Sequence, residues 1–145
     1  MKKELVNRLK EFLGKNPTLM GRPASTEEIE NAERELGMKM DNDYKEFIQI
    51  FGGAYAGLAI HAFSNGSSIG NETVVELTSK SRALFNESNV FPEINRCYVI
   101  ADDGSGNPIV ISENGEMLLF DYDTGEKTVL SESFEKFIED NFSEW

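Results

Sequence analysis

Residues 25–53 carry two short helical patterns joined by a tight corner, and this stretch constrains the fold most. Ser25, followed three residues later by Glu28, forms a capping box that predicts the start of the first helix. Apolar residues then recur at helical spacing until Gly37, which ends the helix by adopting left-handed backbone. Helices this short are not stable alone, so the rest of the chain must supply a layer that covers them.

The second helix of the pair begins after the corner. Asp41 is placed to cap it, and Gly52-Gly53 marks its end. Its apolar face consists of Tyr44, Phe47, Ile48 and Phe51. The spacing of these aromatic residues is typical of core packing rather than of an exposed groove.

The remainder of the chain predicts a sheet with further helices. Cys97–Ala101, Pro108–Ser112, Glu116–Asp121 and Lys127–Leu130 are short β-type runs separated by turns, which indicates an antiparallel meander. Asn114-Gly115 predicts a tight hairpin turn with positive φ at both central positions.

Four segments follow from this pattern. Residues 1–24 form an N-terminal helix and loop, 25–53 the helix pair, 54–95 one or two short strands and a middle helix, and 96–145 the meander and a C-terminal helix. Asn71 is the expected cap of the middle helix, which should end near Asn86. Either Ser131 or Ser133 opens the last helix. We predict a single α+β domain whose central antiparallel sheet, of about four to six strands, packs against N-terminal, middle and C-terminal helices.

Residues of the helix pair and of the closing helix also resemble a known family. The chain contains, in order, Ile29, Glu33, Leu36-Gly37, Asp43-Tyr44-Lys45, Phe47 and Gly52-Gly53. This series resembles the signature of the SMI/KNR-type superfamily, often called SUKH, and the match continues through 100–107, 109–123 and 133–138. The chain departs from the family pattern at Met40-Asp41, where the family usually has Leu-Pro. The residues that form this structural signature are Ile29, Glu33, Leu36, Gly37, Tyr44, Phe47, Gly52, Gly53 and Phe134.

The resemblance implies a function. Many bacterial members of the superfamily resemble immunity proteins that neutralise polymorphic toxins, and the typical toxins are nucleases. A cognate basic nuclease domain is therefore the expected partner, bound without catalysis. The alternative, implied by eukaryotic relatives, is an intracellular scaffold or regulatory protein with several partners.

The charge distribution gives an independent indication of the partner. The chain of 145 residues has a formal net charge of −12, and residues 96–145 hold 12 acidic residues against 3 basic ones. Such a surface repels nucleic acid and attracts a basic protein, although acidity also serves solubility alone in many proteins. The expected partner-binding carboxylates, which would mimic phosphates, are Asp102, Asp103, Glu113, Glu116, Asp121, Asp123 and Glu126.

Several residues suggest chemistry and have simpler explanations. The oxygens of 102–107 suit Ca²⁺ or Mg²⁺, but the EF-hand spacing is missing and these residue types are the usual ones of a hairpin loop. Asp121 and Asp123 would share a face only if Tyr122 is extended, and edge charges explain them equally well. His61 and Cys97 each stand alone as their residue type, which is too few for a typical zinc site. We therefore predict no enzyme, metal or cofactor.

The location and the state of association follow from what the sequence contains. No run approaches the roughly 18 apolar residues of a membrane span. Charges interrupt the first residues, which do not resemble an export signal; the basic N-terminal helix is expected to pack on the domain, with a membrane-surface role as the alternative. A single cysteine fits a reducing compartment. A cytoplasmic monomer or weak homodimer is expected, without contact to membranes.

Overall fold

The predicted helix pair is present in the computed structural model, which describes residues 1–144. The two helices are α2 (Thr26–Leu36) and α3 (Asn42–Phe51). Both bonds of the Ser25 capping box form, and Gly37 adopts φ 71° at the end of α2. The carboxylate of Asp41 accepts the backbone N–H groups of the first turn of α3. The sequence-based caps of this pair are confirmed.

Two buried polar side chains hold the corner between α2 and α3. The Glu33 side chain, only 8% exposed, accepts the backbone N–H of Met40 at 2.8 Å. The neighbouring N–H of Asp41 donates to the Tyr98 hydroxyl, also at 2.8 Å. Burial raises the pKa of Tyr98, so the hydroxyl stays neutral. The corner is thereby attached both to α2 and to the sheet.

The four predicted strands form one antiparallel meander in the order β3-β4-β5-β6. Its strands are β3 (Cys97–Asp102), β4 (Pro108–Ser112), β5 (Met117–Asp121) and β6 (Glu126–Ser131). Register shifts interrupt the β3–β4 and β5–β6 pairings once each. A separate two-stranded hairpin consists of β1 (Ala54–Tyr55) and β2 (Ala59–Ile60).

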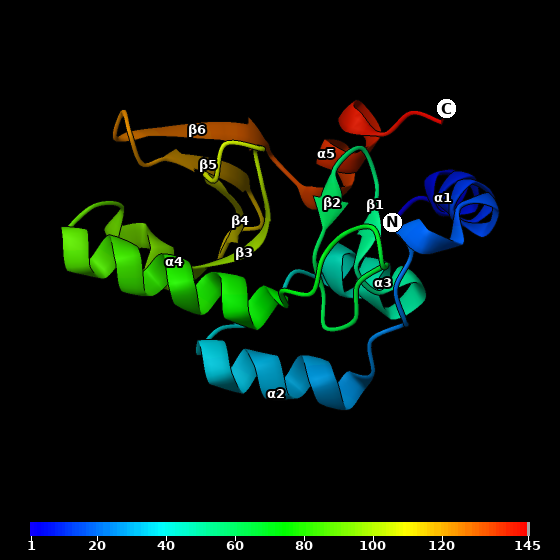
Figure 1. The fold of residues 1–145 in the computed structure, drawn as a ribbon, viewed down its shortest axis with the longest axis horizontal. Helices are drawn as coiled ribbons and strands as arrows, with labels where there is room; N and C mark the ends of the chain where they lie inside the picture. Colours follow the sequence, from blue (N-terminus) through cyan, green and yellow to red (C-terminus); the bar gives the residue numbers. More distant parts are fainter. Residues whose placement is uncertain (145) are drawn as a thin grey trace.

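Helices cover both faces of the meander (Figure 1). On one face, Val99, Val110 and Phe120 pack with Phe85 of α4 (Val74–Ser88). On the other face, sheet residues such as Tyr98 join the main core with α1 (Lys3–Lys15), α2, α3 and α5 (Phe134–Asn141). Two 3₁₀ turns, η1 (Pro17–Leu19) and η2 (Pro92–Arg96), complete the elements. The chain folds as a single α+β domain, as predicted.

One predicted helix cap, that of α4, is wrong, and the structure locates the end of α4 and the cap of the last helix more closely. α4 is capped by Thr73 rather than Asn71, because the Thr73 side chain and Glu76 form a second capping box. The helix continues past Asn86 to Ser88, and Asn89 closes it in left-handed backbone. For the last helix, Ser133 rather than Ser131 provides the cap.

The hairpin at Asn114-Gly115 forms, but its geometry differs from the prediction. Only Gly115 adopts positive φ, at 83°. The N–H of Gly115 donates to the Ser112 carbonyl, and the N–H of Ser112 to the Glu116 carbonyl. The connection is thus a three-residue loop, in which one left-handed residue suffices, rather than a two-residue loop that requires two.

Arg82 of α4 contacts carbonyl groups of three different chain segments. Its guanidinium donates to the carbonyls of Leu36 at 2.8 Å, Cys97 at 2.9 Å and Ile94 at 3.3 Å. Arg82 therefore joins the end of α2, η2 and the start of β3. The planar guanidinium suits this role because it carries five donors in fixed directions.

The glycine pair after α3 is required by a close approach of three chain segments. A Cβ on Gly53 would overlap Asn65 Oδ1, and one on Gly52 would overlap the carbonyl of Arg22. The Asn65 side chain accepts the N–H of Ala62 at 2.8 Å and donates to the Glu72 carbonyl at 2.9 Å. The sequence signature at Gly52-Gly53 is therefore a packing requirement.

In the described part of the chain, no helix has the length and apolar character needed to cross a membrane.

We predict that Gly53→Ala lowers the free energy of unfolding by at least about 2 kcal/mol, because the added methyl displaces Asn65 and its hydrogen bonds. Gly14→Ala is the matched control, since Gly14 lies inside α1 with nothing near its Cβ position. The control should stabilise the protein by about 0.5–1 kcal/mol. Urea unfolding measures both changes, and equal midpoints for the two variants would contradict the proposed packing role.

Candidate partner-binding surface

Two turns meet at one end of the meander. The loop after β3 spans 103–107, and the turn after β5 spans 122–125. The Asn107 Oδ1 atom accepts the backbone N–H of Tyr122 at 3.2 Å, which links them. Five of the seven predicted partner-binding carboxylates lie here. We call this group the acidic turn cluster: Asp102, Asp103, Asp121, Asp123 and Glu126.

The first turn is organised by its own carboxylates. Asp102 Oδ1 accepts the N–H of Gly104 at 2.6 Å. Asp103 Oδ1 accepts the N–H groups of Ser105 at 2.8 Å and Asn107 at 3.1 Å, while its Oδ2 accepts the Asn107 side-chain amide at 3.0 Å. The segment is the predicted hairpin loop. Its aspartates are held in fixed directions by the backbone that they stabilise.

The same contacts control protonation of Asp103. The Asn107 side-chain hydrogen bond, followed by the bond from the Ser105 N–H, lowers the pKa of Asp103 below its usual value. The carboxylate is exposed and stays ionised at neutral pH. The first turn therefore presents a permanent negative charge.

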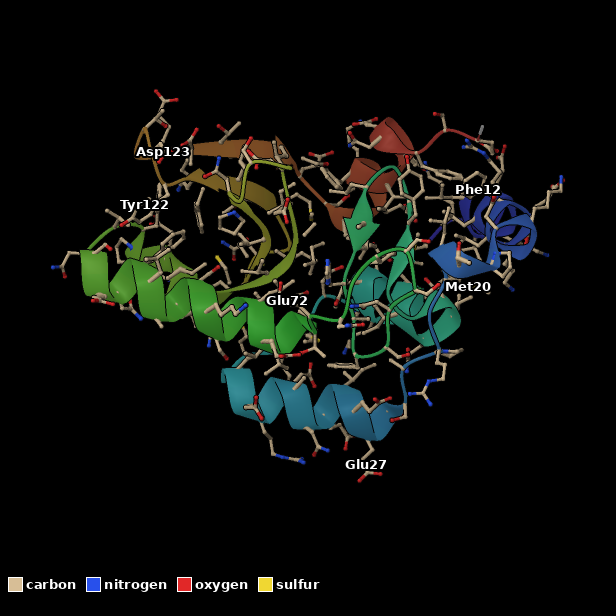
Figure 2. All side chains as sticks on the ribbon, viewed as in Figure 1. Phe12, Met20, Glu27, Glu72, Tyr122 and Asp123 are labelled. Atoms are coloured by element: carbon tan, nitrogen blue, oxygen red, sulfur yellow. The ribbon has the colours of Figure 1, made fainter. Side chains whose placement is uncertain are left out.

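The second turn does not have the extended geometry that a catalytic carboxylate pair at Asp121 and Asp123 would need. Asp121 Oδ1 accepts the N–H groups of Asp123 at 3.0 Å and Thr124 at 3.1 Å, so the chain reverses directly after β5. The Tyr122 ring stacks on Phe85 with centroids 5.9 Å apart. Figure 2 shows Asp123 pointing away from the body of the protein. Asp121 thus shapes the turn, and Asp123 extends from it.

Glu113 and Glu116 lie at the opposite end of the sheet. They belong to the β4–β5 hairpin, where Glu113 Oε1 is 3.5 Å from the Arg96 Nε atom. The same hairpin borders a groove with Lys39 and Lys45. The structure therefore divides the seven predicted carboxylates into a group of five and a group of two.

Ion pairs make the acidic turn cluster more distinct than the sequence suggested. Many acids near the C-terminal end are compensated within the fold: Glu139 pairs with Lys2, Glu144 with Arg8, and Asp140 with Lys136. By contrast, within residues 1–144 no member of the acidic turn cluster has an ion-pair partner. The uncompensated charge of the last third is therefore concentrated at this end of the sheet.

A second acidic surface lies on α2. Glu27, Glu30 and Glu35 are exposed there, and Arg34 lies between them in the sequence. Figure 2 places Glu27 on the opposite side of the molecule from Asp123. This face offers three removable charges at a distant position, which makes it a useful control.

The two solitary reactive side chains are held in the fold. His61 Nδ1 lies 2.6 Å from the Glu72 carbonyl oxygen and 3.3 Å from the Asn65 side-chain nitrogen. Cys97 is buried, and burial raises the pKa of its thiol to about 11. A thiol with that pKa is protonated at neutral pH and is a poor nucleophile.

Three further features contribute to this surface, and the sequence reasoning missed two of them. Asn107 joins the two turns, Tyr122 attaches the second turn to α4, and β6 continues from it as an exposed strand. Only the strand carried a sequence signal, since its Lys127–Leu130 run was expected to be β. The other two contacts join residues far apart in the chain, which no local pattern reports.

The helix pair, the meander and the covering helices define a single α+β domain, and the acidic turn cluster lies at one end of its meander. The chain belongs to the SMI1 / KNR4 family (SUKH-1), whose model matches residues 23–140. That family includes immunity proteins, which bind toxins. No curated protein matches the chain.

We predict that Asn107→Ala raises the pKa of Asp103 toward its ordinary value, because it removes the largest cause of the depression. A carboxylate whose pKa is lower in the folded state than in the unfolded state stabilises the fold at pH values above its pKa in the unfolded state. This contribution disappears as the pH falls through its pKa in the folded state. The variant should therefore lose less stability than the wild type on acidification. Carboxyl chemical shifts followed by NMR measure the pKa, and unchanged titration of Asp103 would show that Asn107 does not control it.

Proposed function

We propose that this protein is an immunity protein that binds a cognate protein toxin, inhibiting it by covering its active-site surface without catalysis. Family membership supports the general role. The observation that carries the proposal is the acidic turn cluster, because its carboxylates have no ion-pair partner within residues 1–144. A nuclease toxin has a basic surface for nucleic acid, and carboxylates fixed at one end of a sheet match that surface in charge.

The site of action in this proposal is the cytoplasm, where a nuclease toxin would reach its substrates. The protein acts there as a monomer in a one-to-one complex. Electrostatic attraction accelerates encounter, and the rigid turns reduce the entropy lost when the carboxylates are immobilised in the complex. Direct binding to nucleic acid plays no part, because the negative surface repels phosphates.

The first experiment tests the function itself. The product of the adjacent large gene is the candidate toxin to test: its co-expression with this chain should restore growth, and the two proteins should purify as a stoichiometric complex. Toxicity that persists at matched expression would contradict the immunity role. Co-purification with several unrelated proteins, without rescue, would instead support a scaffold or regulatory protein.

The second experiment tests the surface. The triple variant Asp102→Asn, Asp123→Asn and Glu126→Gln keeps side chains of similar shape, and the amide introduced by Asp102→Asn retains an oxygen that can accept the N–H of Gly104 in the turn. We expect its association rate with the toxin to fall by about tenfold or more at low salt, with a weaker dependence on salt.

The matched control removes the same number of charges from α2, through Glu27→Gln, Glu30→Gln and Glu35→Gln. Its association rate should change by less than about twofold, since the charges removed are remote from the contact. Stopped-flow kinetics at several ionic strengths measures both variants. Equal losses in the two triple variants would show that net charge, and not this surface, governs association.

A further inference from the structure

Strand β6 has an open hydrogen-bonding edge. It lies at the end of the strand order and pairs only with β5. Within the described chain, no backbone hydrogen bond joins β6 to any other element. Figure 1 shows it as the upper margin of the sheet. Five of its six residues are exposed. The outward N–H and C=O groups are thus accessible to another chain.

The side chains of β6 do little to block such pairing. Val129 is 55% exposed and Leu130 36%, so the second half of the strand offers apolar surface, with Leu130 at the register shift between Val129 and Ser131. No proline interrupts it. Its single lysine, Lys127, lies with its Nζ atom 3.7 Å from Glu93 of η2. Natural edge strands are usually protected by charges, prolines or bulges. In β6 the charged residues are the first two and the register shift lies near the other end, so the pairing is regular from Lys127 to Val129.

Charge decides which occupant fits this edge. Asp121, Asp123 and Glu126 precede or begin the strand, and Glu132 follows it. A second copy pairing antiparallel along β6 would bring Glu126 of one molecule close to Glu132 of the other, and like charges opposed across strands are destabilising. A basic segment would meet opposite charge at both ends. The charges along this edge therefore disfavour pairing with a second copy of the protein and favour pairing with a cationic chain.

We propose that β6 binds an extended segment of the toxin as an additional antiparallel strand, with lysine or arginine at both ends of the segment and apolar side chains at its centre. Main-chain hydrogen bonds along β6 would provide affinity, and the flanking carboxylates would provide register. This inference rests on the proposed function, which supplies the toxin as the partner, and it adds the way in which β6 binds that partner.

Two proline variants test the pairing directly. Adjacent residues in a strand direct their N–H groups to opposite sides, so of Lys127→Pro and Thr128→Pro one removes a bond to β5 and the other removes an outward donor. The free protein shows which variant is which. The variant that loses a bond to β5 has a lower thermal midpoint, and the variant that loses an outward donor has a nearly unchanged one. We expect the outward variant to bind the catalytically inactive toxin domain at least about tenfold more weakly than the wild type.

Hydrogen exchange of the wild-type protein provides a second measurement that needs no variant. Outward amides of 126–131 should exchange rapidly in the free protein and become protected in the complex with the inactive toxin domain. If the wild type binds but these amides stay unprotected, or the outward proline variant binds equally well, the β6 inference is wrong and the immunity role stands. If the wild type does not bind the toxin domain, the immunity role fails, and this inference fails with it.

Discussion

The pairing of two adjacent backbone N–H groups at the α2–α3 corner underlies the rest of the structure. Glu33 accepts the N–H of Met40, and the Tyr98 hydroxyl accepts that of Asp41. An unpaired buried N–H costs about 1–3 kcal/mol, so two unpaired neighbours would open this corner. Because Tyr98 lies in β3, the same pair of bonds fixes the helix layer against the sheet. Glu33 and the corner thus explain why a charged residue belongs to the signature.

The corner also explains how the chain tolerates its departure from the family pattern. Proline after the corner would supply a preset helix start and no N–H. Asp41 instead caps α3 through its carboxylate and brings an additional donor, which the Tyr98 hydroxyl satisfies. A substitution that adds a polar group is acceptable here because a partner from the sheet lies within reach.

Local features could be predicted from the sequence, and contacts between distant residues could not. The capping box at Ser25 and the hairpin at Asn114-Gly115 depend on residues only a few positions apart, so composition and spacing reveal them. Arg82, by contrast, meets three carbonyls from different segments, and a backbone acceptor leaves no signature in side-chain identity. The same limit applies to Asn65, whose polar contacts hold the segment opposite Gly53.

The sign of the charge on the candidate surface could be predicted from the sequence, but the position of this surface could be predicted only in part. Counting acids located the excess negative charge in the last third of the chain, but the count does not register that Lys2 and Arg8, near the start of the chain, pair with Glu139 of α5 and with Glu144. The fold cancels charge at one end of the molecule and leaves it at the other. The sequence does not reveal this cancellation, because paired residues such as Arg8 and Glu144 are far apart in the chain although they are adjacent in space.

The acidic turn cluster and the open edge of β6 are consequences of one topology. A meander places alternate turns at the same end, so the turns after β3 and β5 bring their aspartates together, and the last strand necessarily has a free edge. Hydrogen bonds to the turns hold Asp103 and Asp121 in place but also use part of their acceptor capacity. Asp123 and Glu126 keep theirs and adjoin the edge. Carboxylates held by the turns therefore lie beside carboxylates with free acceptor capacity, at the start of a strand with an open edge.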